Sequence, residues 1–225
     1  ELNIISHLGS LLAVVLYYNK LLFKIIRSLR VFYRPDLDKN LSLFFNLIIS
    51  TIPIVIVGYF FGKNFDYRDE DLILIIGVTS ILFAIILYIA DKYCLMVRNQ
   101  DAVDYRLAFL TGLFQCLALV PGVSRAGANM IMLRSLGFNR NFTVKYSNLL
   151  SIPVILGAVV FLITNENNFF IDDILNFNVV LVFLLSFLFS LIFIHFLISW
   201  VRKSSLLIFI LYRIFFGSTL LIFFL

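Results

Sequence analysis

The stretch Pro121-Gly122-Val123-Ser124-Arg125-Ala126-Gly127-Ala128-Asn129 lies between two apolar runs and decides how this chain folds. Pro121 and Gly122 interrupt an apolar helix, and a broken backbone is tolerated at membrane depth only where it is buried in protein or lines a wet cavity. An arginine at that depth costs about 2.5–3.5 kcal/mol on insertion scales. Arg125 is therefore expected to face a partner or an aqueous cavity.

The residues after the break have the chemistry of an anion site. Ser124 is a favoured N-cap residue, so a helix is predicted to begin at Arg125. Free N–H groups at a helix start, a hydroxyl and a guanidinium fork together suit a phosphate group. Gly127 would allow a ligand to approach the backbone closely. The alternative is a capped re-entrant turn whose Arg125 side chain extends to the membrane interface.

The composition indicates an integral membrane protein. Hydrophobic residues make up 62% of the 225 residues and charged residues 14%, with a mean hydropathy of +1.03. A soluble domain has about 45–50% apolar and about 25% charged residues. The net charge of +5 does not indicate nucleic-acid binding, because the basic residues lie in short loops between apolar runs. These basic residues are explained by the tendency of Lys- and Arg-rich loops of membrane proteins to stay in the cytoplasm.

The apolar runs are continuous rather than alternating, which predicts an all-α, polytopic integral membrane protein with about five to six transmembrane helices. The expected spans are residues 2–18, 42–62, 72–90, 146–164, 178–200 and 206–225. The basic loops 19–40, 91–106 and 201–205 are expected in the cytoplasm, and the loops 63–71 and 165–177 outside.

Residues 107–120 and 125–136 are each too short for a bilayer core that needs about 20 helical residues. Together they predict a re-entrant helical hairpin, 107–136, that enters and leaves on the cytoplasmic side and ends before Gly137.

Three further polar residues are weighed. Arg134 follows Arg125 by nine residues, about two and a half helical turns, so the two lie on roughly opposite faces. Arg134 is expected to extend to the membrane interface. His7 is expected to be a packing or hydrogen-bonded residue. Gln115 lies within reach of the break and could hydrogen-bond across helices.

The first residue is Glu1 rather than Met, and an apolar run follows at once. We therefore expect residues 1–225 to be a single membrane domain that lacks its true N-terminus.

The motif at 121–128 resembles the P-G-x-S-R-S-G-A signature of undecaprenyl-diphosphate phosphatases of the bacitracin-resistance type. Other segments resemble that family in the same order along the chain: 7–14, 105–109, 112–119, 136–140, Ser151-Ile152-Pro153 with Gly157-Ala158, and Tyr212-Arg213. Two positions depart from the signature. Ala126 replaces its second serine and cannot donate to a phosphate, whereas Asn129 replaces its usual threonine and still can.

The family's E-x-x-x-E-x-x-P and S-S-x-G-H motifs do not occur here, and His7 lacks the context of the latter. The resemblance implies that they lie in a missing upstream element of about 40–50 residues, the first of two inverted re-entrant repeats. The resemblance also implies that residues 1–225, without this upstream element, are inactive.

The resemblance implies a membrane hydrolase that converts undecaprenyl diphosphate to undecaprenyl phosphate, recycling the lipid carrier for peptidoglycan and envelope polymers and conferring bacitracin resistance. Arg125 and Ser124 are the expected catalytic residues. The expected substrate-binding residues are Gly122, Gly127, Asn129 and Gln115.

No residue is assigned as a metal ligand and no cofactor is assigned, although a divalent cation, Mg²⁺ or Ca²⁺, is a candidate. The expected partners are the polyprenyl diphosphate lipid and the bilayer of the bacterial cytoplasmic (inner) membrane, with a homodimer as a candidate assembly and no nucleic acid. The alternative function is a lipid-phosphate or anion transporter, or a flippase, because broken helices in inverted repeats also build transporters.

Overall fold

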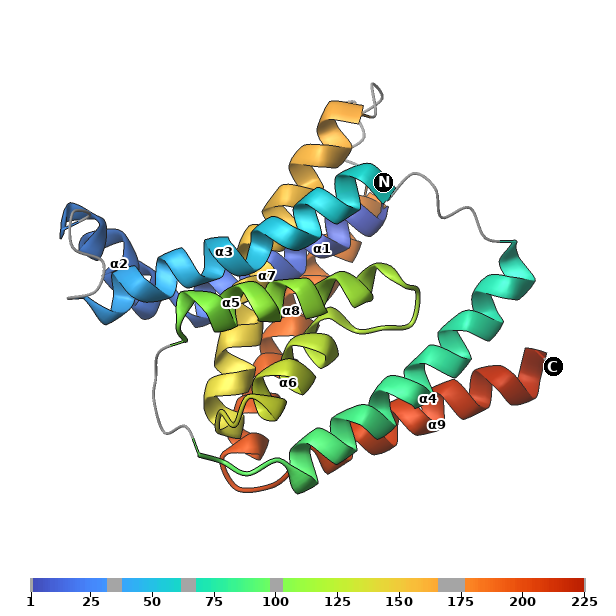
Figure 1. The fold of residues 1–225 in the computed structure, drawn as a ribbon. Helices are drawn as coiled ribbons and strands as arrows, with labels where there is room; N and C mark the ends of the chain where they lie inside the picture. The colour runs from blue at the N-terminus through green and yellow to red at the C-terminus, as the bar shows by residue number, and fades with distance from the viewer. Residues whose placement is uncertain (1, 32–37, 62–67, 98–102, 166–176, 225) are drawn as a thin grey trace.

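The computed structural model describes residues 2–31, 38–61, 68–97, 103–165 and 177–224 (Figure 1). Helices are the only regular structure in these ranges. They are α1 (Leu2–Tyr17), α2 (Asn19–Ser28), η1 (Leu29–Val31), α3 (Lys39–Phe61), α4 (Asp69–Tyr93), α5 (Tyr105–Gln115), η3 (Cys116–Leu119), α6 (Arg125–Ser135), α7 (Arg140–Asn165), α8 (Phe177–Val201) and α9 (Leu207–Phe224).

Five of the described helices, α3, α4, α7, α8 and α9, are long and apolar enough to cross a membrane, and the bent pair α1–α2 makes a sixth candidate. Their outward faces carry large apolar side chains; Phe189 of α8 is 67% exposed. Such a surface suits lipid rather than water. The predicted all-α, multi-pass membrane fold is confirmed.

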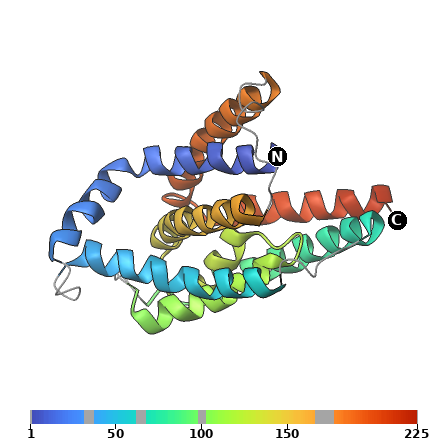
Figure 2. The same ribbon diagram turned by 90° about the horizontal axis from the view of Figure 1, so that it is seen from above.

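The helices pack in pairs around α6. Helix α1 lies against α8, α3 against α5, and α4 against α9, while α6 contacts α4, α5 and α7. Figure 2 shows α4 and α9 side by side, with the C-terminus near the start of α4. At their contact, a Cβ on Gly217 would lie 2.8 Å from the carbonyl oxygen of Gly77. Small residues allow this close approach of membrane helices.

Buried polar contacts join α3 to the elements beside it. Ser50 of α3 donates to the carbonyl oxygen of Ala108 at 2.7 Å, and its hydroxyl lies 2.8 Å from that of Tyr146 in α7. Tyr146 donates to the carbonyl oxygen of Asn46 at 3.0 Å. These bonds hold α5 and α7, the neighbours of α6, at fixed positions on α3.

Several sequence-predicted boundaries are revised. Residues 19–31, expected within a loop, form α2 and η1 because apolar residues recur at helical spacing there. Helix α7 begins at Arg140 rather than at 146, since the side-chain oxygen of Asn139 accepts from the N–H of Phe142 at 2.8 Å and caps the helix. Helix α6 ends before Gly137 as predicted, because this residue has a φ of +87°.

The segment 107–136, expected as a re-entrant hairpin, consists of α5 and η3, an irregular break and α6. The side from which this segment enters the membrane stays a prediction. The expected outer loops 63–71 and 165–177 lie mainly outside the described residues, as does part of the loop 91–106.

The expectation that Arg134 reaches the membrane interface is wrong. Its side chain is 1% exposed and its Nε lies 3.2 Å from a carboxylate oxygen of Asp91, which also accepts from Nε of Arg140 at 2.7 Å. Arg134 further donates to the carbonyl oxygens of Asp91, Cys94 and Phe138. The other oxygen of Asp91 accepts from the N–H of Leu206 at 3.1 Å. A saturated guanidinium paired with a carboxylate is one form in which arginine is tolerated inside a membrane protein.

Candidate functional site

The start of α6 has the predicted capped geometry. Ser124 has an extended backbone (φ −68°, ψ 129°), and its hydroxyl oxygen accepts from the N–H of Gly127 at 3.2 Å. The helix begins at Arg125, whose own N–H belongs to the first turn and has no carbonyl partner within the helix. A serine cap therefore leaves part of the N–H cluster at the helix start available to an anion.

The break before α6 is fixed by Gly122 and by its contacts with α4. Gly122 has a φ of +84°, and a Cβ there would lie 2.1 Å from the hydroxyl oxygen of Thr79. That hydroxyl donates to the carbonyl oxygen of Pro121 at 2.7 Å. Only glycine meets both demands, a left-handed backbone and direct contact with a neighbouring helix.

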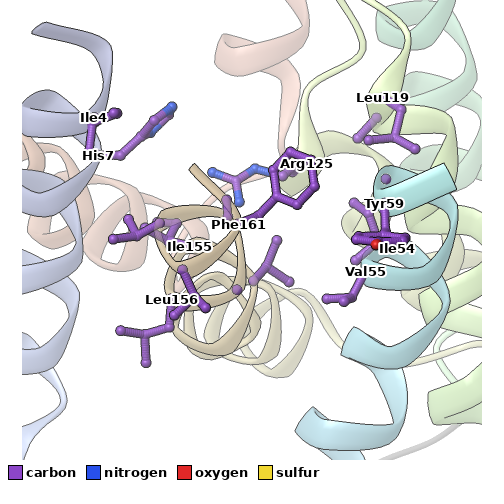
Figure 3. Close-up of a pocket in the computed structure, with 17 residues that line it drawn as sticks. Ile4, His7, Ile54, Val55, Tyr59, Leu119, Arg125, Ile155, Leu156 and Phe161 are labelled. Atoms are coloured by element: carbon purple, nitrogen blue, oxygen red, sulfur yellow. The ribbon is translucent and has the colours of Figure 1, made fainter. Parts of the chain in front are cut away.

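Arg125 lines two cavities. One, of about 240 Å³, is lined mainly by polar residues; the other, of about 710 Å³, is lined mainly by apolar residues. Figure 3 shows the guanidinium of Arg125 projecting into the larger cavity, between His7 of α1, Phe161 of α7 and Tyr59 of α3. Among the described residues, Arg125 has neither an ion pair nor a hydrogen bond to its side chain.

The polar cavity contains a buried amide pair with two unused atoms. Nδ2 of Asn129 donates to Oε1 of Gln115 at 2.7 Å, and both side chains are almost fully buried. Nε2 of Gln115 and Oδ1 of Asn129 have no partner among the described residues. Because unsatisfied buried polar atoms are costly, these two atoms favour a polar ligand in the cavity. The unused donor belongs to Gln115, so Gln115 is the better phosphate donor of the two.

The helix α7 supplies the other wall of the polar cavity. Ser147, Asn148 and Ser151 line it together with Ser124 and Arg125. The spacing of three and four residues along α7 places the three side chains on one face of the helix. The cavity thus presents hydroxyl and amide groups from α7 as well as from the start of α6.

The larger cavity is a suitable site for a hydrocarbon chain. It is lined by residues of α1, α3, η3 and α7, most of them aliphatic or aromatic. The polar exceptions include Arg125 and His7. A cation that borders both a small polar cavity and a large apolar one suits a molecule with an anionic head and an apolar tail.

A second arginine, Arg213 of α9, also contacts the break. Its Nη2 donates to the carbonyl oxygen of Gly122 at 2.7 Å, and its Nη1 is buried without a partner among the described residues. A Cβ on Gly127 would lie 2.6 Å from Nη1. Gly127 was expected to let a ligand approach the backbone closely. Arg213 occupies that space instead.

The electrostatics of the site favour an anion. Arg125 and Arg213 both lie close to the start of α6, which is the positive end of the helix dipole. In the described part of the chain neither arginine pairs with a carboxylate, whereas Arg134 and Arg140 do. Two unneutralised cations beside a helix N-terminus repel each other unless a bound anion offsets their charge.

The comparisons with known proteins give the family of this chain. Residues 1–219 match the model of the family described as bacitracin resistance protein BacA. The chain belongs to the BacA family.

Curated relatives cover nearly all of the chain. A protein of Pelagibacter ubique named undecaprenyl-diphosphatase is 38% identical over 95% of this chain and 78% of its own length. Proteins of the same name from Desulforudis audaxviator and Prochlorococcus marinus are 34% and 35% identical, and the matches cover 98% and 99% of this chain. The resemblance stated from the signature motif is thereby confirmed.

Within this BacA-family fold, the site brings together the predicted residues Gln115, Ser124, Arg125 and Asn129 around one cavity. Gly122 and Gly127 lie beside it and contact α4 and Arg213 through their Cα atoms. Arg213 was not predicted as a residue of the site, although Tyr212-Arg213 is one of the segments that resemble the family. The signal that could have indicated it is an arginine inside an apolar span.

His7 was also not predicted to line the site. It was expected to pack or to hydrogen-bond, yet its side chain is exposed and lines the apolar cavity with Arg125. No group of three or more His, Cys, Asp or Glu side chains that could hold a metal occurs in the ranges that the structure describes.

Proposed function

We propose that this protein hydrolyses undecaprenyl diphosphate to undecaprenyl phosphate and inorganic phosphate. Family membership and the names of the curated relatives support this function. The observation that carries it is the position of Arg125, which lines both a polar cavity and a large apolar cavity. A diphosphate head in the first and the beginning of a polyprenyl tail in the second would fill both.

The reaction transfers the terminal phosphoryl group to water. The water oxygen forms a bond to the terminal phosphorus, the bond from that phosphorus to the bridging oxygen breaks, and the bridging oxygen stays with the lipid phosphate. Charge on the phosphoryl oxygens must be stabilised as this happens. We assign this role to Arg125, with the hydroxyl of Ser124 and the N–H groups at the start of α6.

The remaining polar groups would bind and orient the head group. Nε2 of Gln115 is the unused donor of the cavity, and Asn129 holds Gln115 in place through their 2.7 Å hydrogen bond. Gly122 and Gly127 would shape the site rather than bind the head group, because Gly122 permits the break and Gly127 leaves room for Arg213. None of the described carboxylates pairs with Arg125, and we assign no general base.

A divalent cation is a secondary proposal. The described residues offer no cluster of three metal-ligating side chains, so they do not fit a Mg²⁺ or Ca²⁺ cage built by the protein. Mg²⁺ usually binds through substrate phosphates with only one or two carboxylates. An ion that accompanied the substrate would be held mainly by diphosphate oxygens, and we derive no step through it.

We further propose that the protein resides in the bacterial cytoplasmic (inner) membrane, where its product is reused as the carrier for peptidoglycan and other envelope polymers. Conversion of the diphosphate to the monophosphate would confer the bacitracin resistance after which the family is described. A homodimer is a candidate assembly that an oligomeric-state measurement would test. The transporter alternative has no support in the names of the relatives or in the described residues.

The test expresses the full reading frame, purifies the protein in detergent and measures the release of inorganic phosphate. Wild type should release phosphate from undecaprenyl diphosphate without a sealed compartment, and Arg125→Ala should lose about 10²–10³ in turnover. Arg202→Ala is a matched control, because Arg202 is exposed and lies in the link between α8 and α9. Activity that required sealed vesicles, or equal turnover by Arg125→Ala and wild type, would overturn the proposal.

A further inference from the structure

Helix α2 departs sharply from the direction of α1. The axes of α1 and α2 are bent by 76° at Tyr18, whose backbone (φ −100°, ψ 16°) leaves the helical conformation. Figure 2 shows α2 turning away from α1 toward the beginning of α3. If α1 follows the membrane normal, a bend of this size places the axis of α2 close to the membrane plane.

The ten residues of α2 divide into three faces. One face packs on the protein: Ile25 and Ser28 are buried, and Leu21 and Leu22 contact the core. A second face carries Phe23 and Ile26, which are 68% and 64% exposed. Residues three apart lie on the same side of a helix, so these two side chains form one apolar stripe.

The third face is basic. Lys20, Lys24 and Arg27 follow one another at spacings of four and three residues and are exposed. In the described ranges none of the three forms an ion pair or a side-chain hydrogen bond. A stripe of unpaired cations therefore lies directly beside a stripe of exposed apolar side chains.

This combination has one chemical match. Exposed Phe and Ile side chains beside unpaired Lys and Arg side chains are typical of a helix that lies in the membrane interface, with the apolar stripe among acyl chains and the cations at anionic head groups. Water alone would satisfy the cations but not the apolar stripe, and hydrocarbon alone would do the reverse. The surface of an anionic membrane satisfies both.

We propose that α2 is an in-plane interfacial helix, in which Phe23 and Ile26 insert among lipid acyl chains and Lys20, Lys24 and Arg27 bind the phosphate groups of anionic lipids. The excess of Lys and Arg in residues 19–40 places this helix at the cytoplasmic leaflet. There each basic residue near the surface strengthens attraction to anionic lipid by about fivefold. The lipid contact is separate from the site at α6 and does not depend on the proposed hydrolysis.

The first test measures lipid selectivity. The full-length protein is reconstituted in phosphatidylcholine vesicles, and the motionally restricted fraction of spin-labelled phosphatidylglycerol is compared with that of spin-labelled phosphatidylcholine. Wild type should prefer phosphatidylglycerol, and the triple variant Lys20→Gln/Lys24→Gln/Arg27→Gln should lose most of this preference. The control variant Arg106→Gln/Arg202→Gln/Lys203→Gln removes the same charge from exposed positions elsewhere and should keep it. Equal selectivity of wild type and the α2 variant would overturn the proposal.

The second test measures the depth of the apolar stripe. Phe23→Trp in a Trp200→Phe background provides a single fluorophore on α2. Its emission should be quenched by brominated phosphatidylcholine and shielded from aqueous iodide. Strong iodide quenching without bromine quenching would show that water covers this stripe. Protection from both quenchers would show that protein covers it, through a second copy or another segment. Either result would overturn the proposal.

Discussion

At the scale of single residues, two arginines in one short helix have opposite chemical situations. Arg125 begins α6 and has no ion pair among the described residues, whereas Arg134 near its end is 1% exposed and pairs with Asp91. A guanidinium that is already saturated with protein oxygens stabilises the fold. A guanidinium that faces a cavity without such partners is available to a ligand.

We expect these two arginines to be separable by experiment. Arg125→Ala should abolish most phosphate release at an unchanged Tm, and Arg125→Lys should also be impaired because lysine lacks the bidentate fork. Arg134→Ala leaves Asp91 buried with one cation fewer, which should cost about 3 kcal/mol of stability. Thermal unfolding in detergent and turnover per folded molecule measure the two effects. An Arg134→Ala protein with wild-type Tm would contradict this division.

Gln115 provides a second prediction at this scale. Gln115→Met removes the unused donor while keeping the length of the side chain, and kcat/KM should fall about 10- to 100-fold, the value of a hydrogen bond to a charged group. Gln115→Glu should lower kcat/KM further, because a carboxylate facing the cavity repels a diphosphate. Thr111→Val is the control, because among the described residues the Thr111 hydroxyl on the same helix donates to the carbonyl oxygen of Leu107 alone. An unimpaired Gln115→Glu enzyme would place the head group elsewhere.

At the scale of elements, the break between η3 and α6 is held from two sides. The hydroxyl of Thr79 in α4 donates to the carbonyl oxygen of Pro121, and Arg213 in α9 donates to that of Gly122. Because α4 and α9 pack on each other, the pair acts as one support. The direction of the first turn of α6, and therefore of Arg125, depends on this support.

We expect Gly122→Ala to disrupt the support. The new Cβ would be 2.7 Å from backbone atoms of Ile76 as well as 2.1 Å from Thr79, and an alanine at φ +84° is strained by about 1–2 kcal/mol. Tm and turnover should both fall. Adding Thr79→Ala to Gly122→Ala should restore little of the lost Tm or turnover, because the clash with the backbone of Ile76 remains.

Gly58→Ala is the stability control for this substitution. Within the described ranges its Cβ would meet only Leu119, at 3.8 Å, which is an ordinary contact, so the Tm of Gly58→Ala should stay near that of wild type. A Gly122→Ala protein with wild-type Tm and turnover would show that α4 can yield at this point and that the geometry of the break is not critical.

At the scale of the whole molecule, basic and acidic segments alternate along the chain. Most of the basic residues lie in segments 19–40, 91–106 and 201–205, and segments 63–71 and 165–177 lean acidic. The loops alternate along the chain as a multi-pass topology requires, so the basic set is predicted in the cytoplasm. The hairpin 107–136 should then enter and leave on that same side.

Single cysteines in a Cys94→Ser/Cys116→Ser background test this topology with a membrane-impermeant thiol reagent on intact cells. Cysteines at 67 and 167 should be labelled, and those at 37 and 203 should not, because the reagent reaches only the outer surface. The reverse pattern would invert the protein in the membrane. Labelling at both 100 and 140 would exclude a hairpin that opens to the cytoplasm.

The sequence by itself determined the features that depend on neighbouring residues. Continuous apolar runs predicted the membrane helices, Ser124 predicted the start of α6, and Gly137 predicted its end, because hydrophobic periodicity and capping are local. The signature around Arg125 indicated the anion site for the same reason. The spacing of Arg125 and Arg134 placed them on opposite faces of one helix, but it did not show what each face meets.

Only the tertiary structure decided those partners. Arg213 lies 91 residues beyond the carbonyl that it contacts, Arg134 lies 43 residues from Asp91, and Gln115 meets Asn129 across the break. Each contact arises where helices from distant parts of the chain pack at a particular rotation and separation. No local pattern encodes that rotation, because it results from the packing of all the helices together. The same packing left Arg125 without an ion pair or side-chain hydrogen bond in the described part of the chain, lining both the polar and the apolar cavity.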